Sequence, residues 1–282
     1  MNPIQILQNC QKSTSSGRGP SYWDVAANCG ERRYLTDLHK YVDEPRDELR
    51  LGTYVHALLD ARHKGILENS VIDLSEIQDE VWIDALKMNT FIQEYFPEEY
   101  FGRSVASEFR LEPPKEALVK AFGHDEVSGQ ADRLVMISEA DIMRFFQKFG
   151  VGLPGPGLYI LDWKTAGSRA SEKKARGSYL ESIQSKVYPL LLNLYGGEPC
   201  MGMIFMLFIN HAEMRFQDEG PKKQASCQMF FAQHTAQRDA EAIAAVNFAK
   251  MMRDQRIKNP YACIDYQGTE CYFRSQGICP GV

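Results

Sequence analysis

The stretch LYILDWKTAGSR, residues 158–169, decides the fold, because an apolar run of strand length ends in Asp-Trp-Lys-Thr. Successive side chains on a β-strand point to opposite faces, so Leu158, Ile160, Asp162 and Lys164 share one face. Two charges therefore close an apolar row. The pattern allows a solvated Asp–Lys pair at a strand end, or a site where a carboxylate and an ammonium group converge on one substrate. Since D-x-K is a common pattern, the rest of the chain has to decide.

The order of elements around this strand predicts an α/β fold in which a mixed central sheet is covered by helices. Helical and strand periodicities alternate along the chain. Gly196-Gly197 and Pro260 mark the ends of the two longest helices after that strand. The predicted helices cover residues 21–41, 52–65, 75–96, 139–149, 179–195 and 236–258, and the other predicted strands cover 105–111, 128–137, 201–209, 212–217 and 226–233.

Composition favours a soluble globular protein and excludes few functions. The chain has 282 residues, enough for one large domain or two small ones, and its longest apolar run, 201–209, is too short to span a membrane. Residues 1–20 lack both the basic and the apolar region of a secretory signal, so we expect a cytoplasmic protein without membrane contact. A net charge of −5 argues against a surface coated in nucleic acid, but it leaves room for a local basic track.

Four short motifs follow one another in the sequence. Gly52-x-x-x-His56 lies on a predicted helix, and Gly129-x-x-Asp132-Arg133 lies on a predicted strand. Asp162-Trp163-Lys164-Thr165 ends the next predicted strand. In the fourth motif, Gln184 and Tyr188 are four residues apart, so they share one face of the following helix.

This order resembles the RecB-like branch of the PD-(D/E)XK nuclease superfamily, and the four motifs span residues 52–188. No single motif is specific, but four in this order on the expected elements are a strong signal. The resemblance implies a restriction-endonuclease-like core, a mixed sheet flanked by helices. It also implies hydrolysis of phosphodiester bonds with one or two divalent cations. We therefore expect a flexible lead-in over residues 1–20, a nuclease domain over 21–258, and a cysteine-bearing tail over 259–282 that packs back on the domain.

The resemblance also implies roles for single residues. Asp132 and Asp162 would bind Mg²⁺ or Mn²⁺, together with the Trp163 carbonyl, because hard cations prefer oxygen ligands. His56 would add an imidazole ligand, which favours Mn²⁺. Lys164 would orient the attacking water or stabilise the charged transition state. Gln184 and Tyr188 would position the scissile strand or hold Lys164.

Each of these residues also has a purely structural interpretation. His56 fits a half-buried histidine on an amphipathic helix, and Asp132 fits an ion pair with Arg133 at a strand end. A polar tip on a helix that packs against a sheet needs no catalytic reason, which applies to Gln184 and Tyr188. Glu108, in the preceding strand, fits either an extra acidic ligand or an outward-facing strand residue.

A basic loop directly follows the Asp-Trp-Lys motif. A loop of this kind beside a metal site suits the gripping of a phosphate backbone without the reading of bases, although a solvated charged loop is the alternative. Arg32, Arg33 and Tyr34 are candidates for the same track. The residues that we expect to contact nucleic acid in this loop are Arg169, Lys173, Lys174 and Arg176.

The cysteines suggest a second metal centre. Cys263, Cys271 and Cys279 are evenly spaced near the end of the chain, and Cys29 precedes the core. This arrangement resembles the iron–sulfur clasp of AddB-type and CRISPR-associated exonucleases, and it implies a 4Fe–4S cluster on these four thiolates. The late cysteines of those relatives are less evenly spaced, so a zinc site or unliganded cysteines stay open.

The expected function is a metal-dependent DNA exonuclease of recombination, repair or end processing, in a bacterium or a phage. Its partners would be DNA ends and an annealing or recombination protein; the oligomeric state does not follow from the sequence. The alternatives are an endonuclease or RNA-directed nuclease of the same fold, and a catalytically inactive nucleic-acid-binding protein. Redox work by an iron–sulfur cluster ranks last, because no flavin or nucleotide motif accompanies the cysteines.

Overall fold

The computed structural model of the chain describes residues 18–40, 47–67, 79–95, 98–166, 178–210, 225–259 and 271–279. Its centre is a five-stranded sheet in which the strands lie in chain order. The first three strands are antiparallel neighbours, the fourth is parallel to the third, and the fifth is antiparallel to the fourth. The strands are β1 (Arg103–Leu111), β2 (Gly129–Ile137), β3 (Gly157–Ala166), β4 (Cys200–Asn210) and β5 (Ala225–Gln233).

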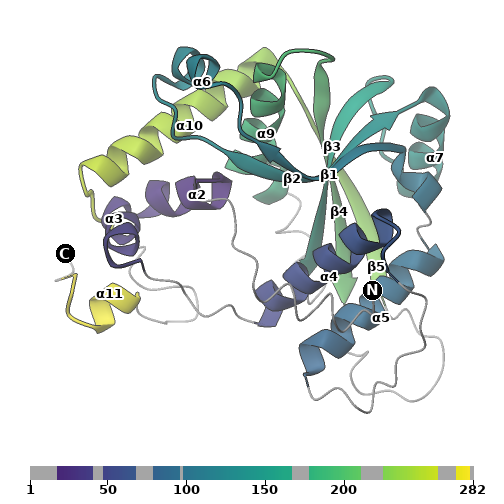
Figure 1. Cartoon of the computed structure of the whole chain (residues 1–282), viewed down its shortest axis with the longest axis horizontal. Coiled ribbons are helices and arrows are strands. Elements are labelled where there is room, and N and C mark those ends of the chain that lie inside the picture. Colours follow the sequence, from purple (N-terminus) through teal and green to yellow (C-terminus); the bar gives the residue numbers. More distant parts are fainter. Residues whose placement is uncertain are drawn as a thin grey trace.

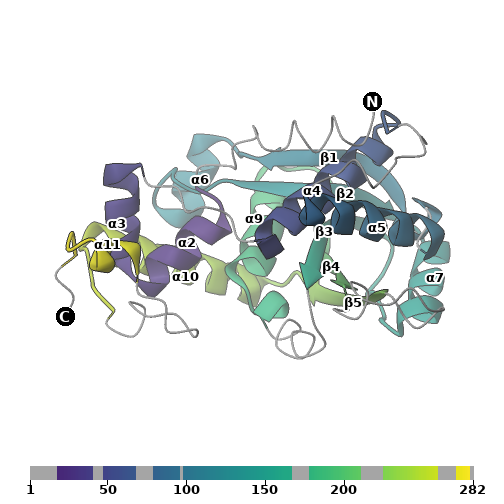
Figure 2. The ribbon, with the colours of Figure 1, turned by 90° about the horizontal axis from the view of Figure 1, so that it is seen from below.

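Helices cover both faces of this sheet (Figures 1 and 2). One face carries α4 (Asp47–His63) and α5 (Glu80–Tyr95), whose apolar side chains share a core with the sheet. The opposite face carries α2 (Pro20–Asn28), α9 (Ile183–Leu194) and α10 (Ala236–Asp254) over a second core. The predicted α/β fold with a mixed, helix-covered sheet is therefore confirmed.

Strand β3 is buried from both sides. Tyr159 and Leu161 belong to the core under α4 and α5, whereas Ile160 belongs to the core under α9 and α10. A strand with two buried faces needs apolar residues at every position, which explains the unbroken run at the start of LYILDWK. The two charges of this segment, Asp162 and Lys164, lie in the second half of the strand, which continues to Ala166.

The remaining elements lie at the periphery. Helix α7 matches its predicted span because Ser138 and Asp141 form a capping box and Gly150 ends the helix in the left-handed conformation. The sequence analysis missed α6, which follows Pro114 and ends at Gly123 with a φ of 79°. These elements are α3 (Gly30–His39), η2 (Glu98–Phe101), α6 (Lys115–Phe122), α7 (Glu139–Phe149) and α11 (Tyr272–Ser275).

The single helix predicted for residues 21–41 is wrong, because α2 and α3 are separated at Cys29. The backbone of Cys29 is extended, with φ −155° and ψ 103°, and its thiol accepts a hydrogen bond from Arg32 N as the cap of α3. The break lets α3 approach α10 so closely that a Cβ on Gly30 would lie 1.8 Å from the Met252 carbonyl oxygen. Tertiary packing therefore overrides the helical periodicity here.

Other predicted boundaries shift by a few residues. Helix α4 begins at Asp47 rather than 52, α9 begins at Ile183 after the Ser182 cap, and α10 ends at Asp254. The predicted strand 212–217, residues 1–17 of the predicted lead-in 1–20, and the helix start at 75–78 lie outside the described residues.

The C-terminal segment meets α3 at the periphery. Phe273 and Cys279 form a small apolar cluster with Leu35, and Tyr34 and Cys271 pack against it. Both views place α11 beside α3 (Figures 1 and 2). Within the described segments, no helix has the length and apolar character needed to cross a bilayer.

Candidate active site

Four elements bring the motif residues together at the end of the central strands. Two glycines favour this approach, since an added Cβ would make a tight contact at Gly52 and a collision at Gly129. At Gly52 of α4, a Cβ would lie 3.3 Å from Thr165 Oγ1 at the end of β3. At Gly129 of β2, it would lie 2.5 Å from the Tyr188 ring of α9. The glycines of the first two motifs therefore let α4 and α9 pack against the strands that carry the acids.

His56, Asp132 and Trp163 form one hydrogen-bonded group. His56 Nε2 lies 2.7 Å from the Trp163 carbonyl oxygen, and its Nδ1 lies 3.3 Å from Asp132 Oδ1. Asp132 Oδ2 accepts a hydrogen bond of 2.7 Å from Trp163 N. The imidazole thus bridges two oxygen atoms that the sequence analysis expected to share a metal ion.

Asp162 and Lys164 form the second half of the site. Lys164 Nζ lies 2.5 Å from Asp162 Oδ2, and the Asp162 side chain is only 1% exposed. Gln184 of α9 donates a hydrogen bond of 2.6 Å to Asp162 Oδ1. The structure therefore places Gln184 on the acid of the D-x-K motif rather than on its lysine.

Tyr188 takes part through the backbone. Its hydroxyl accepts a hydrogen bond of 3.4 Å from Gln130 N, and its ring covers Gly129. Burial raises the pKa of the Tyr188 hydroxyl above its ordinary value of 10, so the hydroxyl stays protonated. These contacts fasten α9 to β2 beside Asp132.

The charges of the first group support one another. Burial lowers the pKa of His56, but the Asp132 carboxylate more than offsets this effect and the pKa rises to about 9. Burial raises the pKa of Asp132, yet the His56 imidazolium outweighs it and the pKa ends below the ordinary value. At neutral pH the pair is therefore an imidazolium and a carboxylate.

The second pair behaves differently because it is more deeply buried. Burial raises the pKa of Asp162 to about 6, although the Lys164 ammonium opposes the shift. Burial lowers the pKa of Lys164, but Asp162 and Asp132 more than compensate and raise it. Lys164 is thus a fixed positive charge. Its Nζ lies 6.0 Å from the ring centre of Tyr179 and 5.9 Å from that of Phe205.

Glu108 of β1 belongs to the same site, and the sequence analysis left it outside its main prediction. Ser107 pairs with Arg133 and Phe109 with Ala131, which sets Glu108 opposite Asp132 across the ladder. Glu108 accepts a hydrogen bond from Gln130 Nε2. Burial and then the Asp132 carboxylate raise its pKa to about 7.

The backbone at Glu108 is unusual for a strand. Its φ is +47°, a conformation that a residue with a side chain rarely adopts outside turns. The alternation of apolar and polar residues in VASEFRL (105–111) gives no sign of this backbone conformation. The nearest signal in the sequence was the acidic residue itself, in the strand before Asp132.

The donor atoms suit a hard divalent cation, although no group of three or more ligands is preassembled in the described part of the chain. Two carboxylates, a carbonyl oxygen and an imidazole lie in the two neighbouring groups described above, and carboxylate and carbonyl oxygens are what Mg²⁺ and Mn²⁺ prefer. Asp162 Oδ2 is buried and lies 2.5 Å from Lys164 Nζ, whereas Oδ1 accepts the hydrogen bond from Gln184. The acids therefore fit a cation once His56 gives up its proton.

The other predicted contacts fall only partly within the described residues. Arg33 pairs with Asp37 at 2.5 Å and stacks over Tyr22, both in the α2–α3 region. The loop residues Arg169, Lys173, Lys174 and Arg176 lie outside the described residues. Cys263 also lies outside them, and Cys29, Cys271 and Cys279 are free thiols.

Comparisons with known proteins agree with this fold. A sequence model of the PD-(D/E)XK nuclease superfamily matches residues 20–279. No curated protein matches the chain. Among solved structures, the chain is similar to the crystal structure of a "Putative exonuclease" from Eubacterium rectale, with 12% sequence identity and a TM-score of 0.50. The likeness covers 85% of this chain and 82% of that one, and at this identity it shows the fold. Because the family match extends over nearly the whole sequence, the chain belongs to the PD-(D/E)XK nuclease superfamily.

Proposed function

We propose that the protein is a metal-dependent DNA exonuclease of the RecB-like branch. The observation that carries the proposal is that four elements bring two neighbouring groups of charged side chains together. His56, Asp132, Asp162 and Lys164 come from α4, β2 and β3, and Gln184 of α9 holds Asp162. A chain without turnover has no reason to keep two buried acids beside a buried lysine, because burying such charges costs free energy.

His56, Asp132, Asp162 and the Trp163 carbonyl would hold the cation. A bound Mg²⁺ or Mn²⁺ supplies a Lewis acid for the phosphate and lowers the pKa of a bound water. His56 must lose its proton before it can act as a ligand, so metal binding releases protons near neutral pH.

Lys164 would stabilise the charge that develops on the phosphate. Because its pKa is raised, it remains an ammonium group and is a poor base. A fixed positive charge in a water-poor site is worth more to a charged transition state than it would be in water. Gln184 is a positioning residue, since it touches Asp162 and fixes the direction of that carboxylate.

The test compares end-labelled linear DNA, closed circular DNA and RNA, each with Mg²⁺, Mn²⁺ or a chelator. Lys164→Ala is the diagnostic variant, and Lys87→Ala is its control, because Lys87 is exposed on α5. We expect metal-dependent shortening of linear DNA, lost by about 100-fold or more in Lys164→Ala and unchanged in Lys87→Ala.

Other outcomes reassign the function. Nicking of the closed circle would show an endonuclease, and cleavage of RNA alone would show an RNA-directed enzyme. DNA binding without any cleavage would leave a binding protein, or a nuclease that needs a recombination or annealing partner, which addition of such a partner distinguishes.

We also propose that Cys29, Cys263, Cys271 and Cys279 hold a 4Fe–4S cluster, with zinc as the alternative. Support comes from the packing of Cys271 and Cys279 against α3, the helix that Cys29 caps. The family match also extends across both cysteine segments. Iron, sulfide and zinc analysis of anaerobically purified protein tests this, with Cys271→Ser beside Cys227→Ser of β5. Wild-type protein without iron or zinc would refute it.

A further inference from the structure

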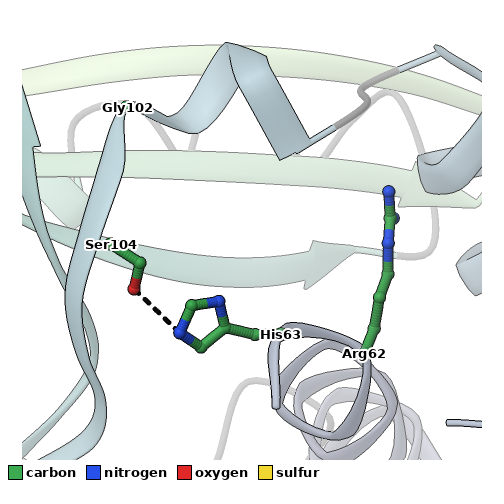
Figure 3. A pocket seen from close by; sticks show the side chains of 4 residues that line it. All are labelled: Arg62, His63, Gly102 and Ser104. Atoms are coloured by element: carbon green, nitrogen blue, oxygen red, sulfur yellow. Dashed lines mark hydrogen bonds between the residues drawn. The ribbon is translucent and has the colours of Figure 1, made fainter. Parts of the chain in front are cut away.

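A separate polar pocket lies two helical turns from the candidate active site. It has a volume of about 380 Å³ and is lined by Arg62 and His63 of α4, Ser104 of β1 and Gly102 just before β1 (Figure 3). His63 follows His56 by seven residues on the same helix, so the two lie on one face about 10 Å apart. The pocket therefore lies on the α4 side of the sheet, along the helix from His56, whereas Gln184 reaches Asp162 from α9 on the opposite face.

The lining of this pocket suits an anion. It contains a guanidinium group, an imidazole and a hydroxyl, and no carboxylate lines it among the described residues. His63 Nε2 and Ser104 Oγ lie 2.9 Å apart, which fixes the ring at the pocket wall. The volume is at the small end of the range for ligand sites, so it suits one group rather than a large molecule.

One nitrogen atom of Arg62 has no acceptor in the described part of the chain. Its Nη1 atom is buried and has no hydrogen-bond partner among the described residues. Arg253, another half-buried arginine, pairs instead with Glu126 at 2.8 Å and Asp254 at 2.6 Å. An unsatisfied buried donor costs free energy, and an incoming anion with several oxygen atoms would remove that cost.

The helix backbone does not stabilise an anion in this pocket. Arg62 and His63 lie in the last turn of α4, and the C-terminal end of a helix carries the negative end of its dipole. Asp60 lies between His56 and the pocket, where Lys64 Nζ balances it at 2.6 Å. Binding would therefore depend on the Arg62 side chain.

We propose that this pocket binds a phosphate group of the nucleic-acid strand, about three nucleotides from the bond that is cut. The inference rests on the proposed function. A distance of about 10 Å corresponds to about three nucleotides at roughly 3.4 Å of rise each. A guanidinium fork matches two phosphate oxygens, and the group could be a terminal monoester or an internal diester.

The first experiment measures binding of oligonucleotides in a chelator, so that no cleavage occurs. Arg62→Gln is compared with Arg103→Gln, since Arg103 is exposed on β1 next to the pocket but does not line it. We expect about tenfold weaker binding for Arg62→Gln. We also expect its slope of log K against log salt to fall by about 0.7 to 0.9. Equal effects in both variants, or none in Arg62→Gln, would overturn the proposal.

The second experiment identifies the phosphate. Oligonucleotides carry or lack a terminal phosphate at either end, or carry one neutral methylphosphonate at the third linkage. Loss of the terminal phosphate should weaken wild type and not Arg62→Gln if the strand end is bound. The neutral linkage should do so if an internal diester is bound. If neither change weakens wild-type binding, the proposal fails.

Inorganic phosphate separates this inference from the proposed function. We expect it to raise the melting temperature of wild-type protein and of Arg103→Gln, but not that of Arg62→Gln, whose fold is checked by circular dichroism. Wild-type cleavage of DNA together with unchanged DNA binding by Arg62→Gln would overturn the pocket and leave the nuclease assignment intact. A phosphate shift without cleavage or binding of nucleic acid by wild type would overturn the strand contact along with the proposed function.

Discussion

Stability should fall as pH rises through the titration of His56. The Asp132 carboxylate, 3.3 Å from Nδ1, overcomes the effect of burial and holds the folded pKa at about 9, against an ordinary value of 6.5. A group whose pKa is raised by folding stabilises the native state fully below 6.5, and this contribution is lost as pH rises through 9. The difference corresponds to about 3 kcal/mol of unfolding free energy.

The measurement is urea unfolding of wild type and His56→Gln in chelator and reductant, at pH values from 6 to 10. We expect the wild type to lose about 3 kcal/mol across the window from 6.5 to 9. His56→Gln should lose much less, so the two stability curves should converge at high pH. Glu108 and Asp162, with pKa values of about 7 and 6, also lower stability as pH rises, but mainly below this window. Parallel curves for the two proteins between pH 7 and 9.5 would refute the reasoning.

Three further predictions concern packing and positioning. Gly129→Ala should lower the free energy of unfolding in urea by about 1 to 3 kcal/mol, because the new Cβ meets the Tyr188 ring at 2.5 Å. In the Tyr188→Ala background the same change should cost much less, and full additivity of the two substitutions would contradict the contact. Gln184→Leu removes the donor to Asp162 Oδ1, so we expect the pKa of Asp162 to rise, the acid limb of the pH–rate profile to move to higher pH, and cleavage to slow. A uniform loss of rate at all pH values would argue against a positioning role. Leu58→Ala should lower the free energy of unfolding by about 2 to 5 kcal/mol, because Leu58 is fully buried. Leu38→Ala should lower it little, because Leu38 is 59% exposed, and similar melting temperatures for the two variants would contradict the core described above.

The sequence by itself determined the layers of the fold and the main acids of the site. A strand that is buried on both faces requires an apolar run such as the one before Asp162, so β3 could be predicted from LYILDWK alone. The capping box at Ser138 and the stop at Gly150 fixed α7 to the residue. These features depend on neighbours along the chain, and a sequence displays such neighbours directly.

Only the tertiary structure decided the features that depend on distant neighbours. The break at Cys29 exists because α3 must pass close to Met252, more than 200 residues later in the sequence. The positive φ of Glu108, whose side chain bonds Gln130 of β2, and the contact between His63 and Ser104 likewise involve partners on other elements. The pKa values of His56 and Asp162 depend on burial and on charges brought in from other elements, so local composition carries no sign of them.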